Sequence, residues 1–278
     1  MIPPIARQFV AGESGATALD HARRLNGDGV GAILNRLGEH YESREHADAD
    51  TDAYCRLLED IAGTGLRACL SVKPTQLGLQ VSEEAFRENL ARVVECADER
   101  DVFVWIDMED HWTIDATLDA FEAHARATDG GVGVCVQANL RRTGDDLERL
   151  AGLPGKVRLV KGAYDPPRNV AYQEKATVND VFEELLEYVF REFEDGIAVG
   201  SHDPAMVARA ASLHEVYGTP YEVQMLMGVR EEAQQDLASQ REVWQYVPYG
   251  RKWPSYFYRR VTENLGNVKF AARAVLSG

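Results

Sequence analysis

Side chains that could do chemistry follow several short apolar runs of this sequence. Lys73 follows one run, Asp107 and Glu109 lie at the end of another, and Lys161 and His202 follow two more. Carboxylates and imidazoles can bind a cation or transfer a proton, and amines can pair with an anion or form a Schiff base. If the runs are parallel strands of one sheet, these side chains gather at one edge, which is where such sheets bind ligands.

The segment Asp107 to His111 combines three acidic residues with a histidine. This composition suits a hard or borderline cation. However, Asp107 and Glu109 share a face only while the strand lasts, and no H-x-H pattern completes the ligand set. The residues therefore favour Asp107 as a group that forms a salt bridge or orients a substrate, and they leave a metal site and a solvated loop as alternatives.

Lys161 lies in "RLVKGAY", directly after an apolar run. A buried amine there could form a Schiff base. Arg158 before it, the Gly162 and Ala163 step after it and Tyr164 beyond suit an anionic or electron-rich cofactor equally well. The spacing alone does not separate these two interpretations.

A second basic group lies near the C-terminus in "YFYRRVTEN", which follows Pro254. Proline often begins a helix, and a helix here would carry Tyr256, Arg259, Arg260 and Glu263 within two turns. Both arginines could hold one carboxylate, with Glu263 bracing Arg259 four residues earlier. The alternative is a solvated helix face with an ordinary ion pair.

Eight apolar or β-branched runs alternate with amphipathic segments and would position these groups. Helical periodicity marks segments 51–63, 82–100, 114–128 and 174–194, and Ser82 and Asp203 are suitable N-caps. Strand and helix in alternation require parallel pairing. Eight such units favour an α/β fold of the (β/α)8 barrel type over a doubly wound sheet. The predicted strands are Val30–Leu37, Gly65–Val72, Val102–Met108, Val132–Val136, Val157–Val160, Ile197–Gly200, Glu222–Met225 and Val243–Val247.

The string "GDGVGA" matches a dinucleotide-binding pattern at Gly27, Gly29 and Ala32. That motif needs a strand before it and a helix after it, so that the pyrophosphate meets a helix N-terminus. Here a helical pattern precedes and an apolar run follows. We therefore interpret the segment as a turn from a helix into a strand.

Composition narrows the classes of function. The 278 residues hold 45 acidic and 30 basic side chains, a formal charge of −15 that disfavours nucleic acid as a partner. The basic residues are 24 Arg and only 6 Lys, which is typical of salt-adapted surfaces. The four cysteines have no C-x-x-C spacing, so we expect small core residues rather than a zinc knuckle or disulfide framework.

The chain has no apolar run of membrane-spanning length and no signal-peptide pattern at its start. We expect one domain over residues 1–278 in the cytoplasm, at most peripheral to the inner face of the membrane.

Several motifs, in order, resemble the proline dehydrogenase family. They are "SVKPTQLG" (71–78), "WIDMED" (105–110), "VCVQANLRRT" (134–143), "RLVKGAY" (158–164), "GSHDP" (200–204), "VQMLMGVR" (223–230), "VPYG" (247–250) and "YFYRRVTEN" (256–264). The resemblance implies a distorted (β/α)8 TIM-type barrel with a C-terminal helix over the active site. It also implies an FAD-dependent enzyme, and because 278 residues have no room for a second enzyme, we expect it to be monofunctional.

The resemblance assigns roles to matching residues. Arg259 and Arg260 would clamp the proline carboxylate beside Lys73, Glu263 would brace the arginines, and Asp107 would orient this basic cluster. The proline ring would lie between Tyr164, Tyr246 and Tyr256. Arg158 would lie near flavin N5 and Leu159 beside the ring. The other implied flavin contacts are Met108 through its backbone, Gln137, Lys161, Gly162, Ala163, Ser201 and His202.

The implied reaction is hydride transfer from proline C5 to flavin N5, which yields Δ1-pyrroline-5-carboxylate. A quinone would be the electron acceptor, and a separate pyrroline-5-carboxylate dehydrogenase is a further candidate partner. Such chemistry depends on orientation and a cationic grip on the substrate. Ser201 and Asp203 stand where the family usually has Thr and Asn, so the adenosine end of the site is expected to differ.

Two other classes of protein compete with this reading. One is a metal- or Schiff-base-dependent barrel lyase or hydrolase that uses Asp107, Glu109, His111, Lys161 and His202. The other is a binding protein without catalysis. A yellow protein that releases FAD would separate the flavoenzyme from both.

Overall fold

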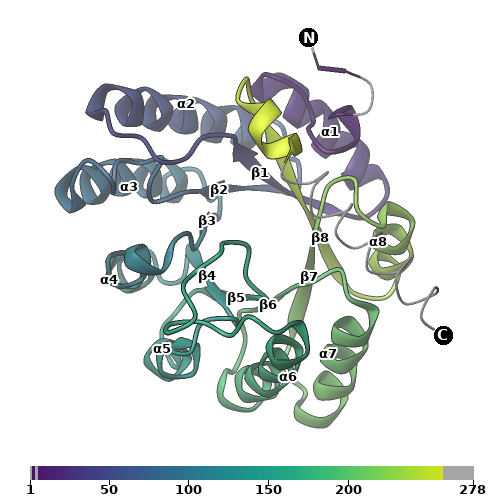
Figure 1. The fold of residues 1–278 in the computed structure, drawn as a ribbon. Coiled ribbons are helices and arrows are strands. Elements are labelled where there is room, and N and C mark those ends of the chain that lie inside the picture. Colours follow the sequence, from purple (N-terminus) through teal and green to yellow (C-terminus); the bar gives the residue numbers. More distant parts are fainter. Residues whose placement is uncertain (1, 4–5, 259–278) are drawn as a thin grey trace.

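A closed barrel of eight parallel strands forms the centre of the molecule (Figure 1). The computed structural model describes residues 2–3 and 6–258, and the strands lie within this part. They are β1 (Gly31–Arg36), β2 (Ala68–Val72), β3 (Val104–Ile106), β4 (Val132–Gln137), β5 (Lys156–Val160), β6 (Ile197–Gly200), β7 (Tyr221–Leu226) and β8 (Glu242–Tyr249). The predicted (β/α)8 barrel is therefore confirmed. The largest difference in length is at β3, which ends at Ile106 and leaves Asp107 at the rim.

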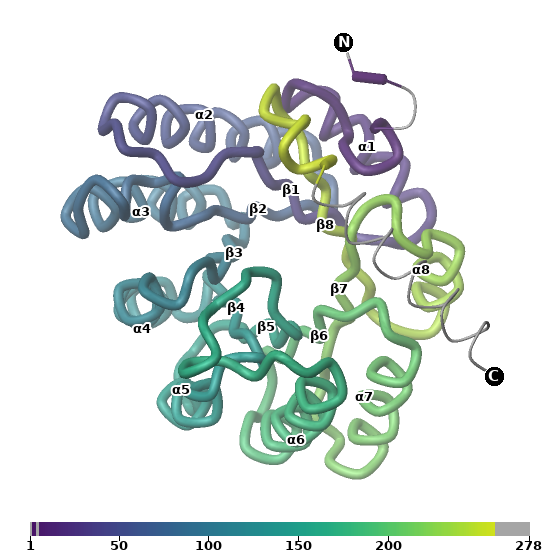
Figure 2. The backbone as a smooth tube through the Cα atoms, viewed as in Figure 1, coloured from purple at the N-terminus to yellow at the C-terminus, as the bar shows by residue number. Residues whose placement is uncertain are grey.

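Helices surround this barrel as the sequence periodicity predicts (Figure 2). They are α1 (Gly15–Gly27), α2 (Arg44–Ala62), α3 (Glu83–Asp98), α4 (Ile114–Ala127), α5 (Thr143–Leu150), α6 (Lys175–Glu192), α7 (Pro204–Tyr217) and α8 (Glu231–Ala238), with short 3-10 turns at Ala6–Gln8 and His111–Thr113. The expected caps form, because the Ser82 side chain accepts from the Ala85 amide and that of Asp203 from the Ala205 amide.

The ring of helices departs from the regular barrel pattern where the sheet closes. β1 pairs with β8, and α1 contacts both of these strands, although it precedes β1 in the chain. The turn from α1 into β1 is the "GDGVGA" segment, in which Gly29 has a φ of +78°. This placement confirms a helix-to-strand turn and rules out the dinucleotide motif there.

The chain turns helical again at residues 253–258, after β8. Tyr256 of this turn packs against Ile2, Ala6, Val10 and Leu37. The rest of the predicted C-terminal helix lies outside the described residues.

The interior divides into two layers because side chains alternate along each strand. A small cluster inside the barrel contains Ile33, Cys69, Trp105 and Ala198. The intervening residues, such as Leu34, Leu70 and Ile106, join the main core under the helices. Gly133 makes room for one indole, since a Cβ there would lie 2.6 Å from the Trp105 ring.

The prediction that all four cysteines are core residues is wrong for two of them. Cys69 and Cys135 are buried, whereas Cys55 on α2 and Cys96 on α3 are half-buried and meet each other. Within the described residues, no helix is long and apolar enough to cross a bilayer.

Candidate active site

Asp107 is the centre of a buried polar cluster at the carboxyl end of β3. Its side chain accepts hydrogen bonds from Ser71 Oγ (2.7 Å), Tyr246 Oη (2.7 Å) and the Arg158 guanidinium. Lys73 Nζ lies 3.9 Å from its second carboxylate oxygen. Parallel pairing puts the ends of β2, β3, β5 and β8 on one rim and brings these groups together.

The charges of this cluster stabilise one another. Burial alone would raise the pKa of Asp107, but Arg158, Lys73 and the hydrogen bonds from Ser71 and Tyr246 lower it below its ordinary value. The carboxyl is therefore ionised at neutral pH. The pKa of Tyr246 is raised by burial and by the adjacent carboxylate, so its hydroxyl stays protonated and remains a donor.

Arg158 points into the barrel from β5. Its guanidinium lies 4.8 Å from the centre of the Trp105 ring and also donates to Gln224 Oε1 at 3.0 Å. Only 5% of the residue is exposed. An aromatic face, an amide and a carboxylate thus hold this cation in one orientation.

Lys73 extends from the end of β2 toward Tyr164 and two acidic groups. Its Nζ donates to Tyr164 Oη at 3.3 Å and lies 4.0 Å from Glu39 Oε2. Burial would lower the pKa of Lys73, but Tyr164 and the nearby carboxylates raise it. The amine is a fixed cation at the rim, which suits an anionic substrate group.

Glu109 fixes the neighbouring loops. Its carboxylate accepts hydrogen bonds from the Thr75 amide (2.7 Å) and the Thr75 hydroxyl (2.8 Å). Gln137 Nε2 donates to the backbone carbonyl oxygen of Glu109 at 2.9 Å. Burial raises the pKa of this carboxyl, although Lys73 and the Thr75 hydrogen bonds oppose the shift. Glu109 thus ties the loop after β2 to the loop after β3.

The Lys161 amine is held by an acid rather than left unpaired. Its Nζ lies 2.8 Å from Asp203 Oδ2 and donates to Asn179 Oδ1 at 2.6 Å. A Schiff base needs an amine that is free to attack a carbonyl, whereas this amine is already engaged by Asp203 and Asn179. The geometry therefore favours the anion-binding interpretation of Lys161.

A pocket of ≈ 240 Å³ lies beside Lys161 at the ends of β4 and β5, with Lys175 and Asn139 also in its wall. Asn139 Oδ1 is buried and has no hydrogen-bond partner among the residues that the structure describes. Gly162 has a φ of +124°, and a Cβ there would lie 2.3 Å from Asn139 Oδ1. Two amines, an unpaired amide oxygen and bare backbone suit the phosphates and hydroxyls of a flavin nucleotide.

The other predicted flavin residues lie near the same strand ends. Gln137 Oε1 accepts from the Ala163 amide at 3.3 Å, and the Leu226 amide donates to His202 Nε2 at 3.1 Å. Ser201 is buried and its hydroxyl accepts from the Asp203 amide at 3.2 Å. Met108 and Leu159 belong to the main core. Leu159 follows Arg158 on β5 and so faces away from the barrel interior, and its flavin contact stays a prediction.

Three predicted substrate residues lie outside the described part of the chain, namely Arg259, Arg260 and Glu263. The structure brings Lys73, Tyr164, Asp107, Arg158 and Tyr246 together. Tyr256 is 8% exposed, and it contributes to the raised pKa of Tyr246.

Comparisons with known proteins agree over nearly the whole chain. The proline dehydrogenase family model matches residues 18–273. The chain belongs to the proline dehydrogenase family. Proline dehydrogenase 1 of Bacillus subtilis (strain 168) is 34% identical over 98% of this chain and 90% of its own length. Proline dehydrogenase of Deinococcus radiodurans is 33% identical over 99% of this chain and 91% of its own length.

A solved structure agrees with this family assignment. Proline utilization A of Bdellovibrio bacteriovorus, inactivated by N-propargylglycine, superposes with a TM-score of 0.84 at 25% identity. The match covers 94% of this chain and 32% of that protein, so the chain spans about a third of its length.

Membership in the proline dehydrogenase family confirms the enzyme class and the activity, oxidation of proline in proline catabolism, that the motifs predicted. It also implies a flavin cofactor. The alternative of a metal- or Schiff-base-dependent lyase or hydrolase is not favoured.

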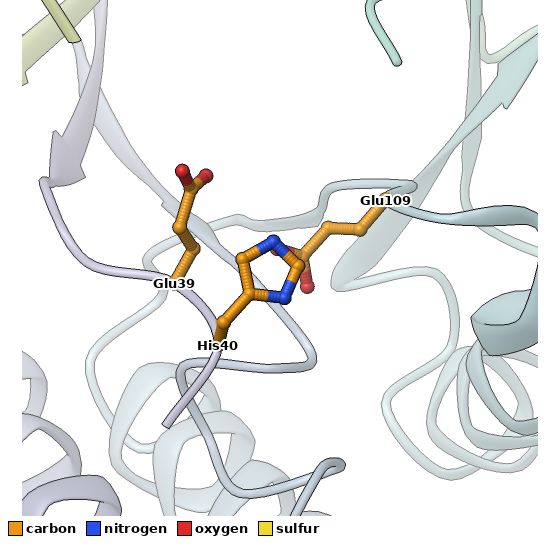
Figure 3. A group of neighbouring side chains, drawn as sticks. All are labelled: Glu39, His40 and Glu109. Atoms are coloured by element: carbon orange, nitrogen blue, oxygen red, sulfur yellow. The ribbon is translucent and has the colours of Figure 1, made fainter. Parts of the chain in front are cut away.

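The side chains that could hold a metal overlap with the predicted ones only at Glu109. In the part of the chain that the structure describes, Glu39, His40 and Glu109 form the candidate cluster, with ligand atoms within 4.8 Å of one another (Figure 3). Asp107 is instead committed to Arg158. Lys73 Nζ lies 4.0 Å from Glu39 Oε2, and Thr75 donates two hydrogen bonds to Glu109, so both carboxylates already have a cationic or donor neighbour within the protein.

Reasoning from the sequence missed several contributors to the site. Trp105 and Gln224 hold Arg158, Ser71 holds Asp107, and Glu39 approaches Lys73. Position at a strand end was the available signal for Ser71 and Gln224. Glu39 lies in the loop that follows β1, and its place in the sequence did not indicate that it would approach Lys73.

Proposed function

We propose that this chain oxidises L-proline to Δ1-pyrroline-5-carboxylate. Bound FAD supplies flavin N5, the acceptor for the hydride that leaves proline C5. The observation that carries this proposal is the buried cluster of Asp107, Arg158, Lys73 and Tyr246 at the barrel rim, beside a pocket suited to a flavin nucleotide.

The substrate carboxylate is gripped by cations. Lys73 is charged and faces Tyr164 at the rim. The family resemblance adds Arg259 and Arg260 to this grip. A bidentate guanidinium fixes both the position and the direction of a carboxylate. Tyr164, Tyr246 and Tyr256 then limit the volume left for the five-membered ring.

Asp107 acts as an anchor rather than as a base. Its lowered pKa makes it a weak proton acceptor at neutral pH, and its oxygens are occupied by Ser71, Tyr246 and Arg158. Loss of a hydride next to nitrogen needs the amine lone pair, so proline reacts as the neutral amine. The side chains contribute orientation and charge instead of a strong base.

The FAD is held by groups at the ends of β4, β5 and β6. Lys161 and Gly162 line the pocket, and the Ala163 amide donates to Gln137 at the end of β4. Ser201 and His202 follow β6, the next strand of the barrel. Met108 and Leu159 complete the proposed set. Asp203 holds the Lys161 amine in place through an ion pair of 2.8 Å.

The remaining parts of the proposal rest on the family resemblance. They are a quinone as electron acceptor and a separate pyrroline-5-carboxylate dehydrogenase as the next enzyme. The proposed location, cytoplasmic and at most peripheral to the membrane, follows the expectation from the hydropathy of the sequence. Absence of a nucleic-acid partner rests on the net charge of −15.

The test is the spectrum of the purified protein and the identity of the nucleotide it releases on denaturation. We expect a yellow protein that releases FAD and whose flavin absorbance bleaches when L-proline is added without oxygen. D-proline serves as the control and should bleach it far more slowly. A colourless protein whose activity depends on added metal would overturn the proposal in favour of the lyase or hydrolase.

A further inference from the structure

The seam between α2 and α3 is built from paired side chains at regular intervals. The two helices lie side by side on the outside of the barrel (Figures 1 and 2). The pairs are Asp48 with Asn89 (2.9 Å), Asp52 with Arg92 (2.5 Å), Cys55 with Cys96 (2.6 Å) and Glu59 with Arg100 (3.2 Å). Partners are separated by 41, 40, 41 and 41 residues, so each turn of α2 meets one turn of α3 in constant register.

The thiol pair lies in the middle of this seam. The Sγ atoms of Cys55 and Cys96 are 2.6 Å apart, against about 2.05 Å in a disulfide bond. Ion pairs one turn away on each side hold the two helices together at this point. Both thiols are half-buried, so a small reagent has access to them.

We propose that Cys55 and Cys96 are a redox-sensitive pair, which a small disulfide such as oxidised glutathione converts into a covalent crosslink between α2 and α3. This inference is independent of the proposed reaction. It rests on the register of the seam and on the distance between the sulfur atoms.

The chemistry is thiol–disulfide exchange in two steps. One cysteine thiolate attacks the small disulfide, forms a mixed disulfide and expels one small thiolate. The second cysteine thiolate then attacks the protein sulfur of that mixed disulfide, forms the Cys55–Cys96 bond and expels the second small thiolate. Two electrons pass from the protein to the oxidant, and the two protons end on the released small thiols.

The surroundings of the pair set the rate of this exchange. Burial, and then the hydrogen bond with Cys96, raise the pKa of Cys55 to about 12. Thiolate is the attacking species, so the reaction is slow at neutral pH and accelerates as the pH rises. The reduced pair is thus the resting form unless an oxidant is present.

The crosslink would join α2 and α3, the helices that follow β1 and β2 of the barrel. The closed loop between the two cysteines contains β2 and Lys73. Tying its ends restricts the unfolded chain and should raise the melting temperature. The bond forms on the outer surface, so we expect kcat and KM for proline to stay unchanged.

The experiment treats the full-length flavin-loaded protein with oxidised glutathione at mildly alkaline pH and maps the tryptic peptides. We expect peptide 45–56 to be joined to peptide 93–100, with the loss of two hydrogens, and the link to disappear on reduction. The melting temperature of the oxidised protein should rise by roughly 5 °C or more above that of the reduced protein.

The controls are Cys55→Ser, Cys96→Ser and the reduced wild-type chain. Neither single variant should gain melting temperature from the oxidant, and each should show glutathione on the remaining thiol. Oxidised wild-type protein that carries glutathione on Cys55 or Cys96 without the joined peptides overturns the proposal. So does a joined pair whose formation leaves the melting temperature unchanged.

Discussion

Replacement of Asp107 by asparagine removes one negative charge from the centre of the candidate site and keeps nearly the same shape. Arg158 and Lys73 then lose the carboxylate that both of them face. The Tyr246 hydroxyl, which donates to Asp107, also loses its charged acceptor. We expect Asp107→Asn to lower both the stability of the fold and the catalytic efficiency with proline.

The size of the stability loss follows from the geometry. At the 3.9 Å between Lys73 Nζ and Asp107 Oδ2, the attraction is about 4 kcal/mol for an effective dielectric constant of about 20. Removing one partner of a buried ion pair typically costs about 3–5 kcal/mol, because the other charge stays buried. We therefore expect the free energy of unfolding to fall by about 3–5 kcal/mol.

The same reasoning fixes the pH dependence. The folded-state pKa of Asp107 is below its ordinary value, so its contribution to stability is present above the unfolded-state pKa of about 3.9. That contribution is lost as the pH falls from there through the folded-state pKa. The difference between wild type and Asp107→Asn should therefore be full at neutral pH and shrink below about pH 4.

The assay is urea unfolding of both proteins from pH 7 to pH 3, with the kinetics of proline oxidation at pH 7. Glu83→Gln is the matched control, because it also neutralises a carboxylate paired with an arginine, but one that is 65% exposed. It should change stability by less than about 0.5 kcal/mol. A loss of under about 1 kcal/mol in Asp107→Asn, or a loss that does not depend on pH, would refute the coupling of these charges.

Four further perturbations test other parts of the site and surface. Arg158→Ala should lower kcat and alter the flavin spectrum, and an effect confined to KM for proline would place Arg158 on the substrate side only. Gly162→Ala should reduce the FAD content at least several-fold, because its φ is +124° and the new Cβ would meet Asn139; full occupancy would remove Gly162 from the cofactor site. Arg259→Lys or Arg260→Lys should raise KM for proline roughly tenfold or more with FAD retained, because lysine lacks the bidentate fork; loss of FAD with unchanged KM would contradict the carboxylate grip. The melting temperature should rise between low and molar potassium chloride, because salt screens the repulsion within a surface of charge −15; a flat or falling midpoint would contradict salt adaptation.

Local sequence patterns were sufficient for the architecture. Periodicity and end signals act within one or two turns, so Ser82 and Asp203 were recognisable as caps before any contact was known. Alternating strands and helices then allow few topologies, because parallel strands need crossover connections. The closed barrel is the outcome of that constraint.

The motifs named residues that the structure places near the rim, but they did not show how these residues interact. Lys161 is the example, since its sequence neighbours suited a Schiff base and an anion site equally. Asp203, 42 residues away, pairs with the amine and so favours the anion site over the Schiff base. Nothing local to Lys161 indicates that partner.

The sequence by itself determined the barrel, the strand ends that carry polar groups and, through its motifs, the family. Only the tertiary structure decided which of these groups meet. Asp107 pairs with Ser71, Arg158 and Tyr246, which lie 36, 51 and 139 residues away, and Cys55 meets Cys96 across a helix seam. Such pairs depend on how the sheet closes and how helices pack in register. These interactions become strong only when folding brings distant segments together and excludes water from both partners. The local periodicity of the sequence contains no information about that step.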